Sequence, residues 1–411
     1  MTATDAITHA ATKEPTRQRV VYEDAEAFDF LRDDWLELEQ RDSRCGIFQS
    51  HAWLSHIWAF EVDPHRQMQL VTVRGADGRL DAVMPLVTEK RLGPVGVRVM
   101  RFLGRGFSDY QDILLADDCD RDATLKLLAD WLADRMERLD LLELTKLQEG
   151  THLWEHRHQL LPEEMPRCMS EAQADDQSRY FPIETDFDAY LMSLSKPTRK
   201  NYRRYWDRLN KAHSIQLRTL ASSRGVDELL DELVRLHQNR QAEKGQRGMF
   251  RSPKRIELFT RLFKALLDEG TMRLHVLEVD GQVYNLELVF YYKHTATAYN
   301  GGMDHHPEVA KHSPGFIAMM KIIEEAHDDK QLTKFDLGQG NEDYKRHIAR
   351  YIQSLHRLSC TRSGLRSRLD QGCHTLLAWA QQNAVVQRLY FGVRPKSTPG
   401  VISGDDGEGQ G

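Results

Sequence analysis

The residues His312, Ser313, Pro314 and Gly315 could together hold an anion. They precede residues 316–328, whose apolar spacing predicts a helix. The first N–H groups of a helix have no partner within it, and the helix dipole favours negative charge there. A phosphate group could therefore bind at this point of the chain. The alternative is purely structural, because serine at the N-cap and proline at the first helical position also make an ordinary helix start.

A second group of side chains with binding chemistry is basic and lies in a helix predicted over residues 195–212. Arg199 and Arg203 are four residues apart and share one face of that helix, as do Lys200 and Arg204. Such side chains could hold a phosphate-bearing substrate through charge-assisted hydrogen bonds. The alternative is a solvent-exposed helix face without a ligand.

The elements that position these groups occur in the same order in both halves of the chain. Strands are predicted over 272–279, 282–292 and 295–301, with Asp280-Gly281 as a hairpin turn, and a strand over 332–337 follows the helix. The first half has a hairpin at Asp77-Gly78, a strand over 98–103, a helix over 121–138 and a strand over 139–145. The shared order suggests two copies of one mixed α/β fold.

The length of 411 residues is enough for two domains with separate cores. We predict a first domain over residues 20–165, a connection over 166–185 and a second domain over 186–392. Residues 1–19 are expected to be a disordered leader, and residues 393–411, which end in a Gly- and acid-rich run, a disordered tail.

Composition excludes several classes of function. The net charge of −6 gives no global attraction to DNA or to an anionic membrane, although a local basic patch could still act. No apolar run approaches the roughly 20 residues of a membrane-spanning helix. Five scattered cysteines suggest neither a zinc site nor a disulfide framework, so a reducing, cytoplasmic environment fits best. The adjacent His305 and His306 have no third ligand nearby, and we predict no metal.

Several short motifs are more specific than this pattern. In chain order they are Met84-Pro85-Leu86, Asp109-Tyr110-Gln111-Asp112, Tyr299-Asn300-Gly301-Gly302, His312-Ser313-Pro314-Gly315, Phe335-Asp336-Leu337-Gly338 and Tyr344-Lys345. Together they resemble the GNAT-type acyltransferases of the CelD/BcsL-like family, over about residues 20 to 390. That family is often encoded with cellulose or other exopolysaccharide functions. It is related to the FemAB-type aminoacyltransferases, which also carry two GNAT-like domains.

The resemblance implies two tandem GNAT-like domains with mixed, mostly antiparallel central sheets, and acyl-CoA as the donor. The thioester arm would lie between two splayed strands, 295–301 and 332–337, and the pyrophosphate would sit on the helix that starts at Ser313. The resemblance places the cofactor next to Lys311, His312, Ser313, Gly315 and Asn300. The chain lacks the best-known Gln/Arg-x-x-Gly-x-Gly/Ala motif before that helix, so an acyl group other than acetyl stays open.

Transfer from a thioester needs a base for the attacking group, donors for the oxyanion and an acid for the leaving thiolate. The base candidates near the expected cleft are Glu287, Asp304, His305 and Asp336. Tyr344 could be the acid and Lys345 could hold the carbonyl. We prefer Tyr344 and Lys345, and then Asp336, as catalytic residues.

On the acceptor side, Asp109 could line a groove between the domains, and Arg199 and Arg203 could bind the substrate. The acceptor itself stays open among sugar amine, sugar hydroxyl, lipid precursor and peptide. One alternative is a FemAB-like transferase, whose aminoacyl-tRNA would contact the basic helix and bind in a salt-dependent way. The other is a non-catalytic scaffold of a polysaccharide synthesis complex.

Overall fold

The computed structural model describes residues 17–361, except 62, 64, 91–95, 162–167, 244–247 and 341. The tail expected over 393–411, most of the leader and the end of the second domain after residue 361 lie outside the described residues. The strand that opens the first half begins at Gln18, inside the stretch expected to be a leader. Within this part of the chain, no helix is long and apolar enough to cross a membrane.

Both halves contribute strands to one continuous sheet. The first half supplies β1 (Gln18–Tyr22), β2 (Arg66–Arg74), β3 (Leu80–Lys90), β4 (Arg98–Phe102), β5 (Leu114–Leu115) and β6 (Leu141–Gln148). The second half supplies β8 (Ile215–Leu220), β9 (Met272–Val279), β10 (Gln282–Tyr292), β11 (Thr295–Met303) and β12 (Lys334–Gln339). Between them lie β7 (Cys168–Pro182) and β13 (Tyr351–Thr361).

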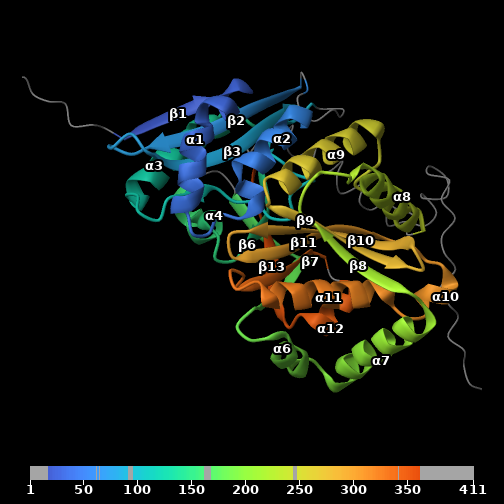
Figure 1. Cartoon of the computed structure of the whole chain (residues 1–411). Coiled ribbons are helices and arrows are strands. Elements are labelled where there is room, and N and C mark those ends of the chain that lie inside the picture. Colours follow the sequence, from blue (N-terminus) through green and yellow to red (C-terminus); the bar gives the residue numbers. More distant parts are fainter. Residues whose placement is uncertain are drawn as a thin grey trace, which may run out of the picture.

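The strand order is β1-β2-β3-β4-β6-β13-β7-β12-β11-β10-β9-β8, with β5 paired to β3 (Figure 1). Among the described strands, β4 with β6 and β11 with β12 form parallel pairs and the others are antiparallel. This confirms the predicted mixed, mostly antiparallel α/β fold. The connection expected over 166–185 is mostly the strand β7, which pairs with β12 on one side and β13 on the other.

Helices cover both faces of this sheet. The first half has α1 (Glu26–Arg41), α2 (His51–Glu61), α3 (Arg121–Met136), α4 (His152–Glu155) and α5 (Arg157–Leu160). The second half has α6 (Phe187–Ser193), α7 (Lys196–Ala212), α8 (Asp227–Glu243), α9 (Pro253–Asp268), α10 (Pro307–Ala310), α11 (Pro314–Asp328) and α12 (Asp343–Ile348). Figure 1 shows α8 and α9 on one side of the second half, and α11, α7 and α6 on the other.

The cores show how the halves are joined. Residues of α1 and α2 pack with residues of α8 and α9 in one apolar cluster that crosses from half to half. Phe48 and Trp53 of the first half both contact Phe290 of β10, at ring distances of 5.6 and 5.5 Å. The face of the second half that carries α11 has its own cluster, and so does the face of the first half that carries α3. The two halves therefore form one continuous body.

The cysteines differ in part from the expectation. Cys45 and Cys119 are free thiols. Cys360, in β13, is disulfide-bonded, although the scattered cysteines suggested no disulfide framework.

Candidate active site

The parallel strands β11 and β12 separate after a short paired stretch. Their pairing runs from Thr295 and Lys334 to Thr297 and Asp336 and then stops. Beyond that point, residues 298–301 of β11 and Leu337 and Gln339 of β12 face a cavity of about 140 Å³. The splay predicted between these two strands is therefore present. Hydrogen-bonding groups of β11 on this edge have no strand partner on β12 there.

The start of α11 opens into a second cavity, of about 320 Å³, lined by Ser313, Pro314, Gly315 and Phe316. Ser313 has a left-handed backbone, with φ of 52°, and its side chain does not cap the helix. Pro314 has no N–H, so the amides of Gly315 and Phe316 are the first donors that the helix presents. Gly315 packs closely on β11, since a Cβ at this position would lie 2.6 Å from Sδ of Met303. The helix start therefore offers bare amides beside the splayed strands.

Glu287 of β10 places its carboxylate at this opening. Glu287 pairs with Gly301 of β11, and a Cβ on Gly301 would lie 2.2 Å from its Oε2. The carboxylate thus crosses β11 where that strand has no side chain. Asn285 lies two residues earlier on the same face of β10, and its Nδ2 donates to Oε1 of Glu287 over 3.2 Å.

The two cavities meet at three side chains, because Glu287, Tyr344 and Arg240 line both. Burial raises the pKa of Glu287 above that of an ordinary glutamate, against the opposing effects of Asn285 and Arg240. Burial also raises the pKa of Tyr344, with a smaller effect of the Glu287 charge in the same direction. The site thus pairs a carboxylate that takes up a proton more readily than usual with a phenol that stays protonated at neutral pH.

The predicted cofactor residues are only partly brought together. Ser313 and Gly315 line the larger cavity, and Asn300 lines the smaller one. Lys311 forms an ion pair with Glu308 on the surface. His312 is buried, and its Nε2 has no hydrogen-bond partner in the described part of the chain. Burial, and then the charge of Lys311, lower the pKa of His312, so neutral pH leaves it uncharged.

Asp336 faces away from the cavities and joins the two halves. Its Oδ1 accepts hydrogen bonds from the Tyr110 hydroxyl over 2.6 Å and from the Gly338 N–H over 2.9 Å. Asp109, which was predicted to line a groove between the domains, also joins the two halves. Its Oδ2 accepts a hydrogen bond from the Gln339 N–H over 3.1 Å. Burial raises the pKa of Asp109. Asp109 and Asp336 thus fix the irregular end of β12 against the first half.

Lys345 lines the smaller cavity, but its amine forms hydrogen bonds with backbone carbonyls. It is 4% exposed, and its Nζ donates to the carbonyls of Gln339 over 2.8 Å and Gly338 over 3.3 Å. The same amine forms a 3.0 Å ion pair with Glu342. Lys345 therefore holds the loop that follows β12 against α12.

Replacing Lys345 with methionine should lower the free energy of unfolding by about 1–3 kcal/mol, because two buried carbonyls lose a charged donor. Urea unfolding measures this change. The matched control is Lys311→Met, which removes an exposed pair with Glu308 three residues away and should cost at most about 1 kcal/mol. Equal effects of the two substitutions would contradict this role of Lys345.

The predicted substrate arginines lie on α7, outside both cavities. Arg199 donates to the carbonyls of Met192 and Leu194, which closes the turn between α6 and α7. Arg203 is exposed on the outer face of the helix. The structure thus does not bring Arg199 and Arg203 together with Glu287 and Tyr344.

Arg240 was not among the site residues predicted from the sequence. It projects from α8, and no local motif marks it among the other charged residues of that helix. Its position follows from close packing of α8 on β11, where a Cβ on Gly302 would lie 2.7 Å from Cβ of Leu236. The feature of the sequence that could have indicated this position is the Gly301-Gly302 pair. It permits both the close packing of α8 and the passage of the Glu287 carboxylate across β11.

One group in the described part of the chain has metal-ligating side chains within reach of one another: Asp42, Asp117 and His152. Both oxygens of Asp42 already accept hydrogen bonds, from the N–H groups of Arg44, Cys45 and Leu115. Its Oδ1 also lies 2.8 Å from Nε2 of His152. This arrangement is that of a hydrogen-bond network within the first half.

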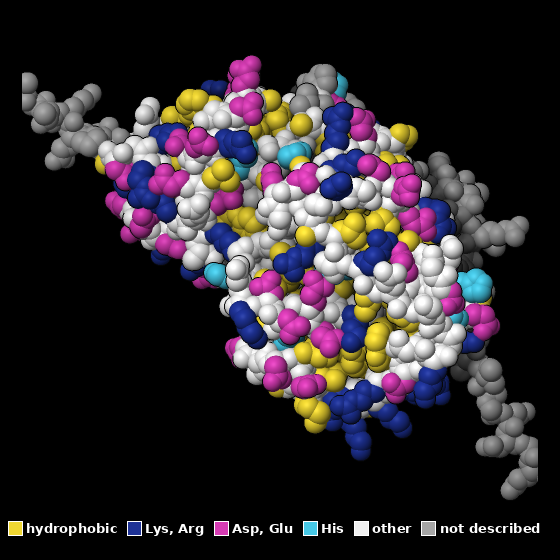
Figure 2. Space-filling view, in the orientation of Figure 1, with side chains coloured by type: hydrophobic (Ala, Val, Ile, Leu, Met, Phe, Trp, Pro, Cys, Tyr) yellow, Lys and Arg dark blue, Asp and Glu magenta, His cyan; other side chains and the backbone are white. Residues whose placement is uncertain are grey.

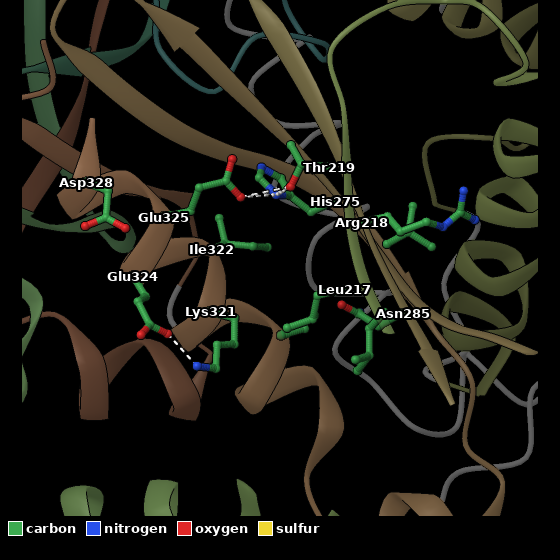
Figure 3. Close-up of a pocket in the computed structure, with 13 residues that line it drawn as sticks. Leu217, Arg218, Thr219, His275, Asn285, Lys321, Ile322, Glu324, Glu325 and Asp328 are labelled. Atoms are coloured by element: carbon green, nitrogen blue, oxygen red, sulfur yellow. Dashed lines mark hydrogen bonds and ion pairs between the residues drawn. The ribbon is translucent and has the colours of Figure 1, made fainter. Parts of the chain in front are cut away.

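A further cavity of about 310 Å³ lies between α11 and the strands β8 and β9 (Figure 3). Thr219 donates to Glu325 of α11 over 2.8 Å, and its hydroxyl lies 3.1 Å from Nδ1 of His275. On the other side, Lys321 and Glu324 pair with each other along the helix. These contacts tie the body of α11 to the sheet, which fixes the direction of its N-terminus.

Comparison with known proteins agrees with this geometry. Residues 196–346 match the family described as Acetyltransferase (GNAT) domain. No curated protein sequence matches the chain. Among solved structures, FemX is similar at 11% identity and a TM-score of 0.57, covering 86% of this chain and 99% of FemX. A conserved protein of unknown function from Bacteroides thetaiotaomicron is similar at 13% identity and a TM-score of 0.52, covering 80% and 97% of the two chains.

The fold is therefore that of tandem GNAT proteins, shared with FemX over most of the chain. Residues 196–346 thus form a GNAT acetyltransferase domain, so the second half of the chain carries an acyltransferase domain of the GNAT type. The matched segment runs from the start of α7 into α12, and thus contains Glu287, Tyr344 and the start of α11.

Proposed function

We propose that the protein transfers an acyl group from acyl-CoA to an amine or hydroxyl by direct attack, with donor and acceptor bound together. The observation that carries the proposal is the opening between β11 and β12, with the bare amides of α11 at one end and the carboxylate of Glu287 at the other. The resemblance to CelD/BcsL-like proteins supports an acceptor of the cell envelope or of an exopolysaccharide.

The donor would enter from the side of α11. Its diphosphate would bind at the amides of Gly315 and Phe316, where the helix dipole favours negative charge. Its pantetheine arm would lie along β11, where the strand has lost its partner, and could form strand-like hydrogen bonds with free backbone groups. The larger cavity lies on this side and the smaller one continues it toward α8.

The acceptor would approach through the smaller cavity, beside Arg240 and Tyr344. Glu287 takes the proton of the attacking nitrogen or oxygen as that atom bonds to the thioester carbon. The carbon–sulfur bond then breaks, and Tyr344 gives its proton to the leaving thiolate. The raised pKa makes Glu287 a stronger base than an ordinary glutamate, and Tyr344 holds a proton that it can give once the thiolate leaves. Lys345 and Asp336 would act by holding β12 and the loop after it.

The proposal predicts that acetyl-CoA or a longer acyl-CoA raises the melting temperature of the protein. A ligand that binds only the folded state adds about 2.7 kcal/mol of stability at a hundredfold excess over its dissociation constant. Thermal unfolding with a series of acyl chain lengths measures the shift. No shift with any acyl-CoA at millimolar concentration, together with a shift by aminoacylated tRNA, would replace this proposal with the aminoacyl-tRNA alternative.

Ser313 offers a matched pair of variants for this test. Both Ser313→Asp and Ser313→Asn tolerate the left-handed backbone, and the serine side chain makes no capping hydrogen bond that could be lost, so neither should lower stability without ligand. The aspartate places a negative charge where the diphosphate would bind, and it should abolish the shift by acyl-CoA. The asparagine carries no charge and should keep more of it. Equal shifts for the two variants would place the diphosphate elsewhere.

A further inference from the structure

The helix α7 carries a high positive charge, which by itself destabilises the helix. Seven of its residues are Lys or Arg and one is Asp, a net charge of +6 in a chain whose net charge is −6. Like-charged side chains four residues apart destabilise a helix, and such pairs follow one another along this one, as at Lys196 and Lys200. Local features still start the helix, because the Ser195 side chain accepts from the Thr198 N–H and a proline stands in the first turn.

The charges are concentrated on the side of α7 that faces away from the protein. Its buried residues, Thr198, Tyr202 and Leu209, belong to the side that packs toward α11. The exposed side carries four cations, which we call the α7 basic face: Lys200, Arg203, Arg208 and Lys211, with one exposed acidic residue, Asp207, among them. None of the four forms an ion pair or side-chain hydrogen bond within the described residues. Figure 2 shows Lys and Arg side chains gathered along the lower edge of the molecule over α7.

An exposed apolar side chain lies near the start of α7. Met192, the penultimate residue of α6, is 59% exposed, and its carbonyl accepts a hydrogen bond from Arg199 of α7 over 2.9 Å. Cations with an adjacent exposed apolar residue are the combination that binds at a lipid headgroup layer. We propose that the α7 basic face, with Met192 beside it, binds an anionic membrane surface.

The aromatic residues of α7 argue against single-stranded RNA as the partner. RNA of this kind is held by bases that stack on free aromatic rings. Tyr205 and Trp206 are half-buried, and their rings are covered by the cations of Arg204, 5.0 Å from the ring centre, and Lys321, 4.5 Å from it. The α7 basic face therefore has no free aromatic ring of α7 beside it on which an RNA base could stack.

The test is co-sedimentation of the protein with vesicles of phosphatidylcholine alone and of phosphatidylcholine mixed with phosphatidylglycerol. Binding is expected only to the anionic vesicles and should fall as salt is raised. Each Lys or Arg near an anionic surface favours binding by about fivefold. Changing all four cations of the α7 basic face to glutamine should thus lower partitioning by more than about a hundredfold. Met192→Ser should lower it by a few fold.

The matched control removes the same charge from the first half, by changing the exposed Arg32, Arg98, Arg121 and Arg138 to glutamine. Those substitutions should leave most of the binding intact. The α7 variant should melt at or above the temperature of the wild type, because it loses like-charge repulsion. The proposal is overturned if the wild type ignores anionic vesicles, if both variants lose binding equally, or if single-stranded RNA binds and vesicles do not.

Discussion

Replacing Glu287 with glutamine is expected to lower turnover by roughly 10²- to 10⁴-fold, the usual contribution of a general base. The substitution keeps the shape of the side chain and its contact with Asn285, but it removes the group that takes the proton. Turnover is measured as release of the CoA thiol from acyl-CoA with a panel of amino sugars and other amines. The thermal shift by acyl-CoA should persist, since the proposed site of the diphosphate is the start of α11.

The pH dependence gives an independent check on Glu287. Its pKa is raised in the folded protein, so turnover of the wild type should rise with pH through a value above that of an ordinary glutamate. A raised folded pKa also means that this group adds stability at low pH and that the contribution is lost as pH rises through the folded pKa. At neutral pH, Glu287→Gln should therefore unfold at the same temperature as the wild type or higher.

The behaviour of Asp336→Asn is the matched comparison. Asp336 accepts hydrogen bonds from Tyr110 and Gly338 outside the cavities, so this variant should lose stability more than chemistry. Unchanged turnover in Glu287→Gln, or loss of the pH dependence only in Asp336→Asn, would transfer the role of base from Glu287 to Asp336.

Replacing Gly338 with alanine is expected to destabilise the protein by about 3 kcal/mol or more. Gly338 has φ of 70°, which costs a residue with a side chain about 1–2 kcal/mol. The new Cβ would also lie 2.4 Å from the carbonyl oxygen of Ala298, on β11, and 2.9 Å from Oδ2 of Asp109. Because these are backbone and buried groups, β12 must shift, and the opening beside it changes shape.

Gly281→Ala is the control for this prediction. Gly281 has a similar φ of 77°, but no atom lies within 4 Å of the position a Cβ would take. The alanine should therefore cost only the unfavourable backbone conformation, about 1–2 kcal/mol. Urea unfolding of both variants measures the difference. If the two variants lose the same stability, the close approach of Gly338 to β11 does not constrain the site.

Local patterns were enough to predict much of the fold and part of the site. The Asp-Gly hairpin turn at Asp280-Gly281 and the helix start at Ser313 follow from residue types at short spacing. Glu287 was one of the base candidates near the cleft that the resemblance implied. The contacts that assign roles are not local. Asp336 meets Tyr110 across 226 positions of sequence, and Lys345 becomes buried only when the loop after β12 folds back. Arg240 reaches the cavities because two glycines let α8 approach β11.

The pairing of strands between the two halves could not be predicted from the sequence either. The segment expected to connect two domains is strand β7, and β13 lies between it and β6 of the first half. Periodicity predicts that such segments are strands, but not which strands they pair with, because pairing is decided by tertiary packing. The two halves that looked like successive copies therefore share one sheet.

The position of β13 has a consequence for synthesis of the chain. The last described strand, Tyr351–Thr361, fills the space between strands that leave the ribosome some 170 to 220 residues earlier. Until it emerges, β6 and β7 expose open edges, the kind of surface on which nascent chains aggregate. The first half therefore cannot complete its sheet until this strand of the second half has been synthesised.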